Sequence, residues 1–340
     1  MARILIIRFS ALGDVAMTIP VIHSLAVQYP QHEITVLSRA VWQPLFQGLP
    51  ANVGFVGADL TGKHKGLWGL NSLYSELKAM HFDYIADFHH VLRSKYLCLR
   101  FRLANKPVAS ICKGRAGKKK LVRRHDKVME NQKSSFRRYA DVLEKLGLPV
   151  LLNFSSIYGE GKGDFAEIEP VTGPKEDQKW IGIAPFAKHA GKIYPLELQE
   201  QVIAHFAANP KVKVFLFGGG KSEQDVFDAW IAKYPSVVSM IGKLNMRTEL
   251  NLMSHLDVML SMDSANMHLA SLVGTRVVSV WGATHYFAGF LGYGQSENDI
   301  VEIKNLECRP CSVFGNKPCY RGDYACLNQI EISEILKKIE

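Results

Sequence analysis

The chain has 340 residues, of which 47% are hydrophobic and 21% charged, and it carries a net charge of +9. This composition is typical of a globular protein, and the length suffices for two domains of ordinary size. No apolar run approaches the roughly 20 residues of a transmembrane helix, and the start of the chain lacks the pattern of a signal peptide. We therefore expect a cytoplasmic location.

The first half of the chain alternates short apolar runs, which are typical of buried strands, with stretches of helical periodicity. The expected strands are residues 4–7, 33–38, 53–57, 84–88 and 109–112, and the expected helices include residues 15–26, 70–80 and 134–146. Strands that alternate with helices predict an α/β fold with a parallel, doubly wound sheet. Residues 148–179, rich in Gly, Pro and acidic residues, mark a domain boundary.

The second half repeats this alternation. The expected strands are residues 180–186, 212–217, 237–241, 258–262 and 277–281, and the expected helices are residues 196–207, 222–234, 247–256, 267–273 and 332–339. The sequence therefore predicts two doubly wound domains, residues 1–165 and 175–325, followed by a C-terminal segment 326–340.

A carboxylate follows the first predicted strand. Asp14 stands beside Gly13 in the turn RFSALGD, which is not a dinucleotide-binding glycine fingerprint. At the carboxyl end of a strand, this carboxylate can accept a proton from an approaching hydroxyl, or it can simply cap the first helix. His89 and His90 follow another strand, but neighbours in a strand point to opposite faces and make no metal pair. One of them can line the cleft or be an ordinary polar residue.

Polar or glycine-rich turns follow three strands of the second half, at residues 187–192, 218–223 and 263–266. Three such turns on one edge of a sheet predict a nucleotide site. Lys188 and Lys192 would balance a diphosphate, and Gly219 and its two glycine neighbours permit close backbone approach.

Two further features of these turns have both a binding and a structural interpretation. Glu223 could accept hydrogen bonds from ribose hydroxyls, or be a favourable acid in the first turn of a helix. Ser264 and the N–H groups after it open a helix, which attracts phosphate, although Asp263 and Ser264 can also merely cap that helix.

Basic residues gather between Lys63 and Arg138 with few acids among them. They include Lys95, Arg100, Arg102, Lys106, Lys113, Arg115, Lys118, Lys119, Lys120, Arg123, Arg124, Lys127, Lys133 and Arg137. Such a segment suits a nucleic acid, an anionic membrane or a phosphorylated substrate, or it is a solvated loop. Residues 115–133 have little periodicity, so we expect a mobile loop there.

Four of the six cysteines lie near the end of the chain, at Cys308, Cys311, Cys319 and Cys326. Their spacing would suit structural zinc. Disulfides are uncommon in the cytoplasm. Metal binding, redox pairing and reduced thiols all remain open for these residues.

Four segments together resemble a known family, namely ILIIRFSALGDV, PFAKHAGKIYP, LFGGGKSEQ and SMDSANMHLASLVGTRVVSVWGAT. They are similar, in the same order over nearly the whole chain, to glycosyltransferase family nine, the bacterial heptosyltransferases of the lipopolysaccharide inner core. The resemblance implies the GT-B architecture, two Rossmann-like domains facing a cleft. It implies a lipid-linked acceptor on the N-terminal domain, ADP-heptose on the C-terminal domain, and a last helix that crosses back to the first domain.

The resemblance also assigns roles to individual residues. Asp14 matches the general base, and Ser10 lies in the same turn, where the family contacts the donor or the transition state. The residues expected at the donor are Lys188, Lys192, Gly219, Glu223, Asp263, Ser264, Ala265 and His268, with Ala265 at a position where glycine is common. Those expected at the acceptor are Lys118, Lys119, Lys120, Arg123 and His89. The family inverts the anomeric centre and uses neither a cofactor nor an active-site metal.

The predicted function is therefore transfer of heptose from ADP-heptose to a lipid A–Kdo-type acceptor, at the anionic inner face of the inner membrane, with peripheral membrane contact. One alternative is another GT-B enzyme, a transferase or epimerase that uses a different nucleotide-sugar. A second is a non-catalytic polyanion-binding protein, suggested by the positive charge. We expect no nucleic-acid partner, because the basic segment has no pattern of aromatic residues for stacking bases.

Overall fold

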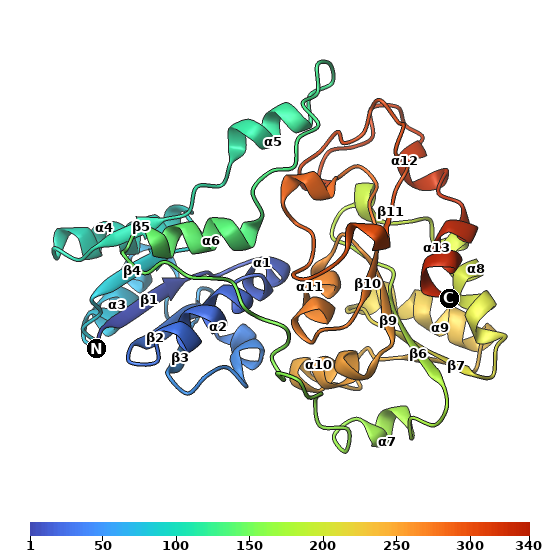
Figure 1. The fold of residues 1–340 in the computed structure, drawn as a ribbon, viewed down its shortest axis with the longest axis horizontal. Helices are drawn as coiled ribbons and strands as arrows, with labels where there is room; N and C mark the ends of the chain where they lie inside the picture. Colours follow the sequence, from blue (N-terminus) through green and yellow to red (C-terminus); the bar gives the residue numbers. More distant parts are fainter. The chain divides into compact units, whose positions relative to one another are not determined.

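The computed structural model describes residues 1–340, and the chain forms two compact units (Figure 1). The first unit comprises residues 1–113 and 134–157, and the second comprises residues 114–133 and 158–340. The division departs from the expected boundary near residue 165 mainly at residues 114–133, which belong with the second unit. Both units have the expected α/β architecture with a parallel sheet.

The sheet of the first unit has five parallel strands in the order β3-β2-β1-β4-β5. Its strands are β1 (Arg3–Ile7), β2 (Glu33–Arg39), β3 (Val53–Ala58), β4 (Tyr84–Asp87) and β5 (Val108–Ser110). Its helices are α1 (Leu12–Ala16), α2 (Ile19–Gln28), η1 (Ala40–Phe46), α3 (Gly66–Lys78), α4 (Leu92–Leu103) and α6 (Ser135–Glu144). β1 lies at the centre, and its four apolar residues are fully buried, as the uninterrupted apolar run predicts.

The helices of the first unit form two pairs, α3 with α4 and α2 with α6. The expected single helix over residues 15–26 is two helices, because the chain turns at Met17 and Thr18 and Pro20 stands in the first turn of α2. Proline is well tolerated there, since the first N–H groups of a helix have no partner within it.

The sheet of the second unit has six parallel strands in the order β11-β10-β9-β6-β7-β8. They are β6 (Lys179–Ala184), β7 (Val212–Leu216), β8 (Val237–Ser239), β9 (Val258–Met262), β10 (Val277–Val280) and β11 (Ile300–Val301). The helices are α5 (Arg115–Leu121), α7 (Glu169–Thr172), α8 (Leu196–Ala207), α9 (Lys221–Lys233), α10 (Met246–His255), α11 (Ala265–Leu272), α12 (Ala325–Asn328) and α13 (Ile332–Ile339), with 3-10 turns η2 (Ala190–Lys192), η3 (Tyr286–Ala288) and η4 (Glu297–Asp299).

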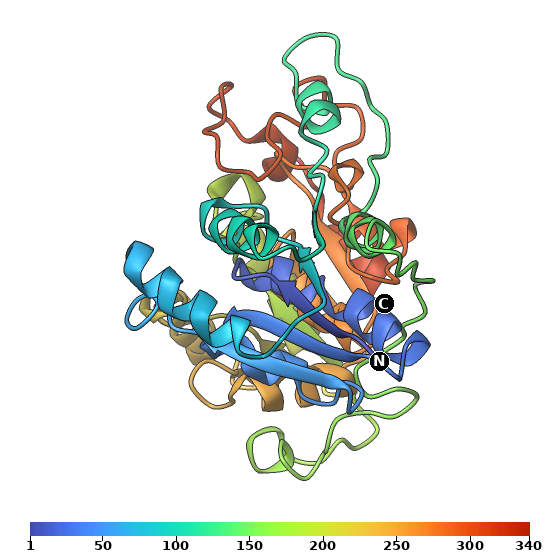
Figure 2. The ribbon, with the colours of Figure 1, turned by 90° about the vertical axis from the view of Figure 1, so that its left-hand side faces the viewer.

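The basic segment differs from the expected mobile loop. Residues Arg115–Leu121 form the helix α5, and the segment is anchored within the second unit. The ammonium group of Lys118 lies 3.9 Å from the centre of the Phe290 ring, and the N–H of Gln132 donates to the carbonyl of Phe287 at 2.8 Å. Figures 1 and 2 show α5 beside the segment that contains η3. Periodicity missed the helix because it is short and only two of its residues are buried.

The last helix, α13, belongs to the second unit. It packs on α8 and β10, and Ile335 and Ile339 are buried in the core of the second unit. The ammonium group of Lys179 donates to the carbonyl of Ile339 at 2.5 Å. None of the helices combines the length and the apolar character needed to span a lipid bilayer.

Candidate active site

Asp14 lies in the first turn of α1, directly beyond the carboxyl end of β1. Its Oδ2 lies 2.8 Å from a guanidinium nitrogen of Arg8 and accepts a hydrogen bond from the N–H of Ala11 at 3.2 Å. The other oxygen, Oδ1, has no hydrogen-bond partner in the chain, and the side chain is 37% exposed. Asp14 therefore does both things that the sequence allowed: it helps to start the helix, and it presents a free carboxylate oxygen.

Arg8, which the sequence analysis did not single out, is nearly buried and pairs with the Asp14 carboxylate from the interior of the first unit. Its side chain is 8% exposed, donates to the carbonyl of Phe88 at 2.7 Å and lies 6.0 Å from the centre of the Tyr139 ring. The hydroxyl of Tyr139 donates to the carbonyl of Asp14 at 3.3 Å. These contacts fix the direction of the Asp14 side chain. The sequence feature that could have pointed to Arg8 is its position as a cation directly after the buried strand β1.

His89 also lies at this edge. Its Nδ1 is 3.3 Å from the N–H of Phe9 and accepts from it, and the ring is buried. Burial, reinforced by the nearby charges of Arg8 and Lys113, lowers the pKa of His89 to about 3. The imidazole is thus neutral at physiological pH.

Two further polar residues complete this edge. Asp87 is fully buried and accepts from the N–H groups of His89 and His90 at 2.9 and 2.8 Å, which makes it a structural cap. Ser10 lies half-buried in the turn between β1 and α1, and its peptide bond to Ala11 is cis.

The three predicted turns of the second unit follow β6, β7 and β9, which are neighbours in its sheet. Because the strands are parallel, their carboxyl ends meet at one edge. This is the edge at which open α/β sheets bind ligands. The three turns, which are far apart along the chain, therefore lie at the same edge of the sheet.

A buried ion pair joins two of these turns. The ammonium group of Lys192, in η2, lies 2.8 Å from Oδ2 of Asp263, and their side chains are 16% and 5% exposed. The hydroxyl of Thr284 donates to the same oxygen at 2.8 Å. Thr284, which follows β10, was not predicted. Lys188 is exposed, so of the two lysines only Lys192 is held by its surroundings.

The three glycines after β7 were expected to permit close backbone approach, but their surroundings in the structure differ. Gly220 has φ +88°, and a Cβ on Gly218 would lie 2.6 Å from Oε2 of Glu223 and 3.0 Å from the Phe227 ring. A Cβ on Gly219 would meet nothing within 4 Å. Oε2 of Glu223 accepts a hydrogen bond from the N–H of Gly219 at 2.8 Å, so Glu223 stabilises the conformation of the glycine turn.

The first turn of α11 begins at Ser264, whose hydroxyl lies 3.2 Å from that of Ser261. Its side chain makes no cap hydrogen bond to the helix. Ala265 is half-buried with helical backbone, and His268 is buried. The helix N-terminus therefore keeps the anion-attracting character of free N–H groups.

The residues expected at the acceptor belong to two different units. His89 belongs to the first unit, whereas Lys118, Lys119, Lys120 and Arg123 belong to the second. Lys118 is buried against Phe290, while Lys119, Lys120 and Arg123 are exposed.

Cys308, Cys311, Cys319 and Cys326 line one small cavity with Arg309 and Arg321. All four are free thiols, and they are not arranged as a metal site. Burial, reinforced by the neighbouring thiols, raises the pKa of Cys326 to about 12.

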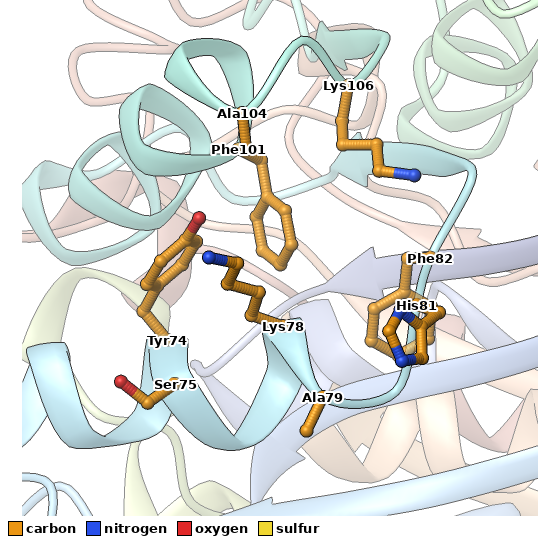
Figure 3. Close-up of a pocket in the computed structure, with 9 residues that line it drawn as sticks. All are labelled: Tyr74, Ser75, Lys78, Ala79, His81, Phe82, Phe101, Ala104 and Lys106. Atoms are coloured by element: carbon orange, nitrogen blue, oxygen red, sulfur yellow. The ribbon is translucent and has the colours of Figure 1, made fainter.

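A cavity of about 390 Å³ lies in the first unit between the ends of α3 and α4. Figure 3 shows it lined by Tyr74, Phe82 and Phe101, with the amines of Lys78 and Lys106 reaching toward it. It contains none of the predicted site residues.

Two doubly wound units, with polar and glycine-rich turns at the carboxyl edge of the second sheet, agree with the GT-B architecture that the resemblance implies. Residues 70–317 match glycosyltransferase family 9 (heptosyltransferase). The chain belongs to this family, and the resemblance read from its sequence is confirmed.

Relatives cover most of the chain. It is 26% identical over 286 residues to the lipopolysaccharide core heptosyltransferase OpsX of Haemophilus influenzae, over 81% of this chain and 78% of that protein. Its fold is similar to a family 9 glycosyltransferase of Veillonella parvula, with a TM-score of 0.74 and 18% identity over 99% and 96% of the two chains. It is also similar to a heptosyltransferase of Escherichia coli solved with ADP, with a TM-score of 0.68 and 14% identity over 99% and 100%.

Proposed function

We propose that this family 9 enzyme transfers a heptose from ADP-heptose to a lipopolysaccharide inner-core acceptor of the lipid A–Kdo type. The observation that carries the proposal is the edge shared by β6, β7 and β9, where a held lysine, an open glycine turn and a helix N-terminus converge. These are groups that bind a nucleoside diphosphate. The relative named as a core heptosyltransferase and the similar structure solved with ADP support this donor and acceptor.

The chemistry assigns a role to each unit. Oδ1 of Asp14 takes the proton of the acceptor hydroxyl while the hydroxyl oxygen of the acceptor forms a bond to the anomeric carbon of the donor sugar. The bond from that carbon to the phosphate oxygen breaks on the opposite side, and ADP leaves. Lys192 and the N–H groups that open α11 stabilise the charge that develops on the diphosphate. Ser10 contacts the donor or the transition state, and Glu223 binds the ribose.

The acceptor in this proposal is anchored in a membrane by its lipid. The enzyme therefore works in the cytoplasm in peripheral contact with the anionic inner face of the inner membrane. Exposed lysines and arginines such as Lys119, Lys120 and Arg123 are attracted to such a surface and to acceptor phosphates.

The test is a transfer assay with the purified full chain, the lipid A–Kdo acceptor and a set of nucleotide-sugars, read by mass spectrometry of the lipid. We expect the acceptor to gain one heptose, and only with ADP-heptose. Equal transfer from a UDP- or GDP-sugar would contradict the donor. Conversion of the donor sugar without any gain of mass on the lipid would indicate an epimerase instead.

A further inference from the structure

The helix α4 has an outer face that nothing in the chain covers. Leu92, Leu99 and Leu103 are 86%, 52% and 73% exposed. They follow one another at intervals of seven and four residues, so the three side chains form one stripe along the helix. Tyr96, which lies between them along the chain, is half-buried and packs against the core of the unit. Single exposed leucines are ordinary, but a stripe of them is not.

The opposite face of α4 already has a partner. Leu97, Cys98 and Phe101 are buried against the sheet, in a core that includes Leu5 and Ile85. The outer leucines therefore do not belong to the core of the unit. A helix that is apolar on two opposite faces is expected to contact two different surroundings.

Basic residues border the outer stripe. Arg93, Lys95 and Arg102 are exposed, and α4 contains no acidic residue. Arg100 is held inward, with its guanidinium 4.3 Å from the Tyr74 ring centre and hydrogen-bonded to the Tyr96 hydroxyl at 3.0 Å. The stripe thus combines leucines with a net positive border.

The neighbouring helix α3 continues this surface at its start. Leu67 and Trp68 are 69% and 89% exposed, and Lys63 and Lys65 before them are exposed as well. Two acids lie nearby: Glu76 pairs with the Lys63 ammonium at 2.9 Å, and Asp59 accepts from the backbone N–H of Lys63 at 3.2 Å. α3 packs against α4, and Figure 2 shows the two helices, light blue and teal, next to each other.

The position of these helices relates the surface to the catalytic edge. α3 and α4 begin after β3 and β4, and α1, which carries Asp14, begins after β1. All three strands are parallel, so Trp68, Leu92 and Asp14 lie toward the same edge of the sheet.

We propose that the outer stripe of α4 and the first turn of α3 together form the surface on which the enzyme rests on an anionic lipid bilayer. An apolar stripe with cationic borders fits the boundary between headgroups and acyl chains, and an exposed tryptophan is favoured at that depth. This inference rests on the proposed function, because it names the face that would bring the catalytic edge to a lipid-anchored acceptor.

The first experiment measures binding of the full chain to vesicles by co-sedimentation, without donor or acceptor. We expect binding to vesicles that contain phosphatidylglycerol and little binding to phosphatidylcholine alone. Replacing Arg93, Lys95 and Arg102 by Gln should weaken the partition by about 10²-fold. The matched control replaces Lys304, Lys317 and Lys337 by Gln, which removes the same charge from exposed positions elsewhere. Equal loss in both variants would overturn the proposed face.

A second variant tests the apolar part, with Leu92, Leu99 and Leu103 replaced by Ser. Because these side chains are exposed, circular dichroism should show an intact fold, while binding to vesicles is lost. The fluorescence of Trp68, obtained by difference from Trp68→Phe, should shift to shorter wavelength on vesicles. If the serine variant instead binds vesicles normally but changes from a dimer to a monomer in light scattering, the face meets a second copy and the membrane proposal is wrong.

A kinetic measurement separates this inference from the proposed function. Both α4 variants should raise the KM for an acceptor embedded in vesicles and leave the KM for an acceptor without acyl chains unchanged. Absence of heptose transfer by the wild-type enzyme would refute the proposed function, while vesicle binding would still decide the role of this face. An equal rise of both KM values would contradict the membrane role.

Discussion

The guanidinium of Arg8 lies 2.8 Å from the carboxylate of Asp14, and the cation is nearly buried while the anion is partly exposed. The ion pair therefore runs from the interior of the first unit, where Arg8 lies, to its surface, where Asp14 lies. Arg8 is fixed by the carbonyl of Phe88, and Asp14 carries a carboxylate oxygen to the surface.

Asp14→Asn should lower kcat by about 10² or more while leaving the affinity for ADP unchanged, because the amide cannot take up a proton. The Asn side-chain oxygen can still accept from the N–H of Ala11, so α1 should form. Steady-state kinetics and calorimetry with ADP measure the two effects. Asp14→Ala is the comparison, since it also removes the contact with Ala11. Turnover near that of the wild type in the Asn variant would remove Asp14 as the base.

Lys192→Gln should weaken ADP binding and also destabilise the fold, whereas Lys188→Gln should affect at most binding. The difference arises because Lys192 neutralises Asp263, which is 5% exposed, and Lys188 is exposed. Leaving a buried carboxylate without its cation costs about 3 kcal/mol. Urea unfolding checks the stability, and calorimetry checks the affinity. Equal stabilities of the two variants would show that the ion pair contributes little.

Gly219→Ala should leave the free energy of unfolding within about 0.5 kcal/mol of the wild type, because a methyl group there meets open space. If the donor approaches the backbone at this turn, the same methyl should raise the Kd for ADP about tenfold. Gly218→Ala is the contrast, since its methyl would overlap Glu223 and Phe227 and should destabilise by about 1–3 kcal/mol. Unchanged ADP affinity in Gly219→Ala would place the diphosphate elsewhere.

The pH dependence of stability should show the neutral state of His89. The unfolded ring binds a proton below a pKa of about 6.5, whereas the folded ring does so only near pH 3. The unfolded state therefore binds more protons between these values, and stability falls as pH is lowered from about 6.5 toward 3. His89→Asn should reduce this slope by at most about 1.4 kcal/mol per pH unit.

Urea unfolding at several pH values measures the slope, and His125→Asn, at an exposed position, is the comparison. Asn is the chosen replacement because its side-chain oxygen can accept from the N–H of Phe9 as Nδ1 does. An unchanged slope in His89→Asn would mean that the ring is protonated in the native protein.

Substitution of the buried Lys118 should have a different effect from substitution of the exposed Lys119 and Lys120 of α5. Lys118→Ser should loosen the segment and speed its proteolysis, because Lys118 packs over Phe290. Replacing the exposed Lys119 and Lys120 by Ser should raise the KM for the lipid acceptor without changing ADP affinity. Limited proteolysis and kinetics measure these outcomes. A loss of ADP affinity in the double variant would assign these lysines to the donor.

The sequence predicted the elements whose signal is local. The unit made of β9, α11 and β10 was expected from an apolar run, a helical spacing and a second apolar run, and β9 was predicted with its exact bounds, Val258–Met262. The meeting of the turns after β6, β7 and β9 at one edge followed from the predicted parallel topology, whereas the strand order of each sheet is known only from the structure.

What the sequence could not show depends on contacts between distant residues. Arg8 and Thr284 stand in no motif, and their roles depend on partners brought near by the fold. Residues 115–133 were expected to be a loop, because the docking of Lys118 on Phe290 leaves no trace in local periodicity. The contact of α13 with α8 and β10 is likewise decided by the core of the second unit.

The assignment of residues 114–133 to the second unit means that the polypeptide passes between the units three times, after residues 113, 133 and 157. Hydrolysis of a single bond between residues 157 and 158 therefore does not produce one fragment per unit. The N-terminal fragment would carry residues 114–133 into the second unit, where Lys118 contacts the Phe290 ring and the N–H of Gln132 donates to the carbonyl of Phe287. Such a nicked enzyme should elute as one species, and its two fragments, expressed separately, should be able to reassemble.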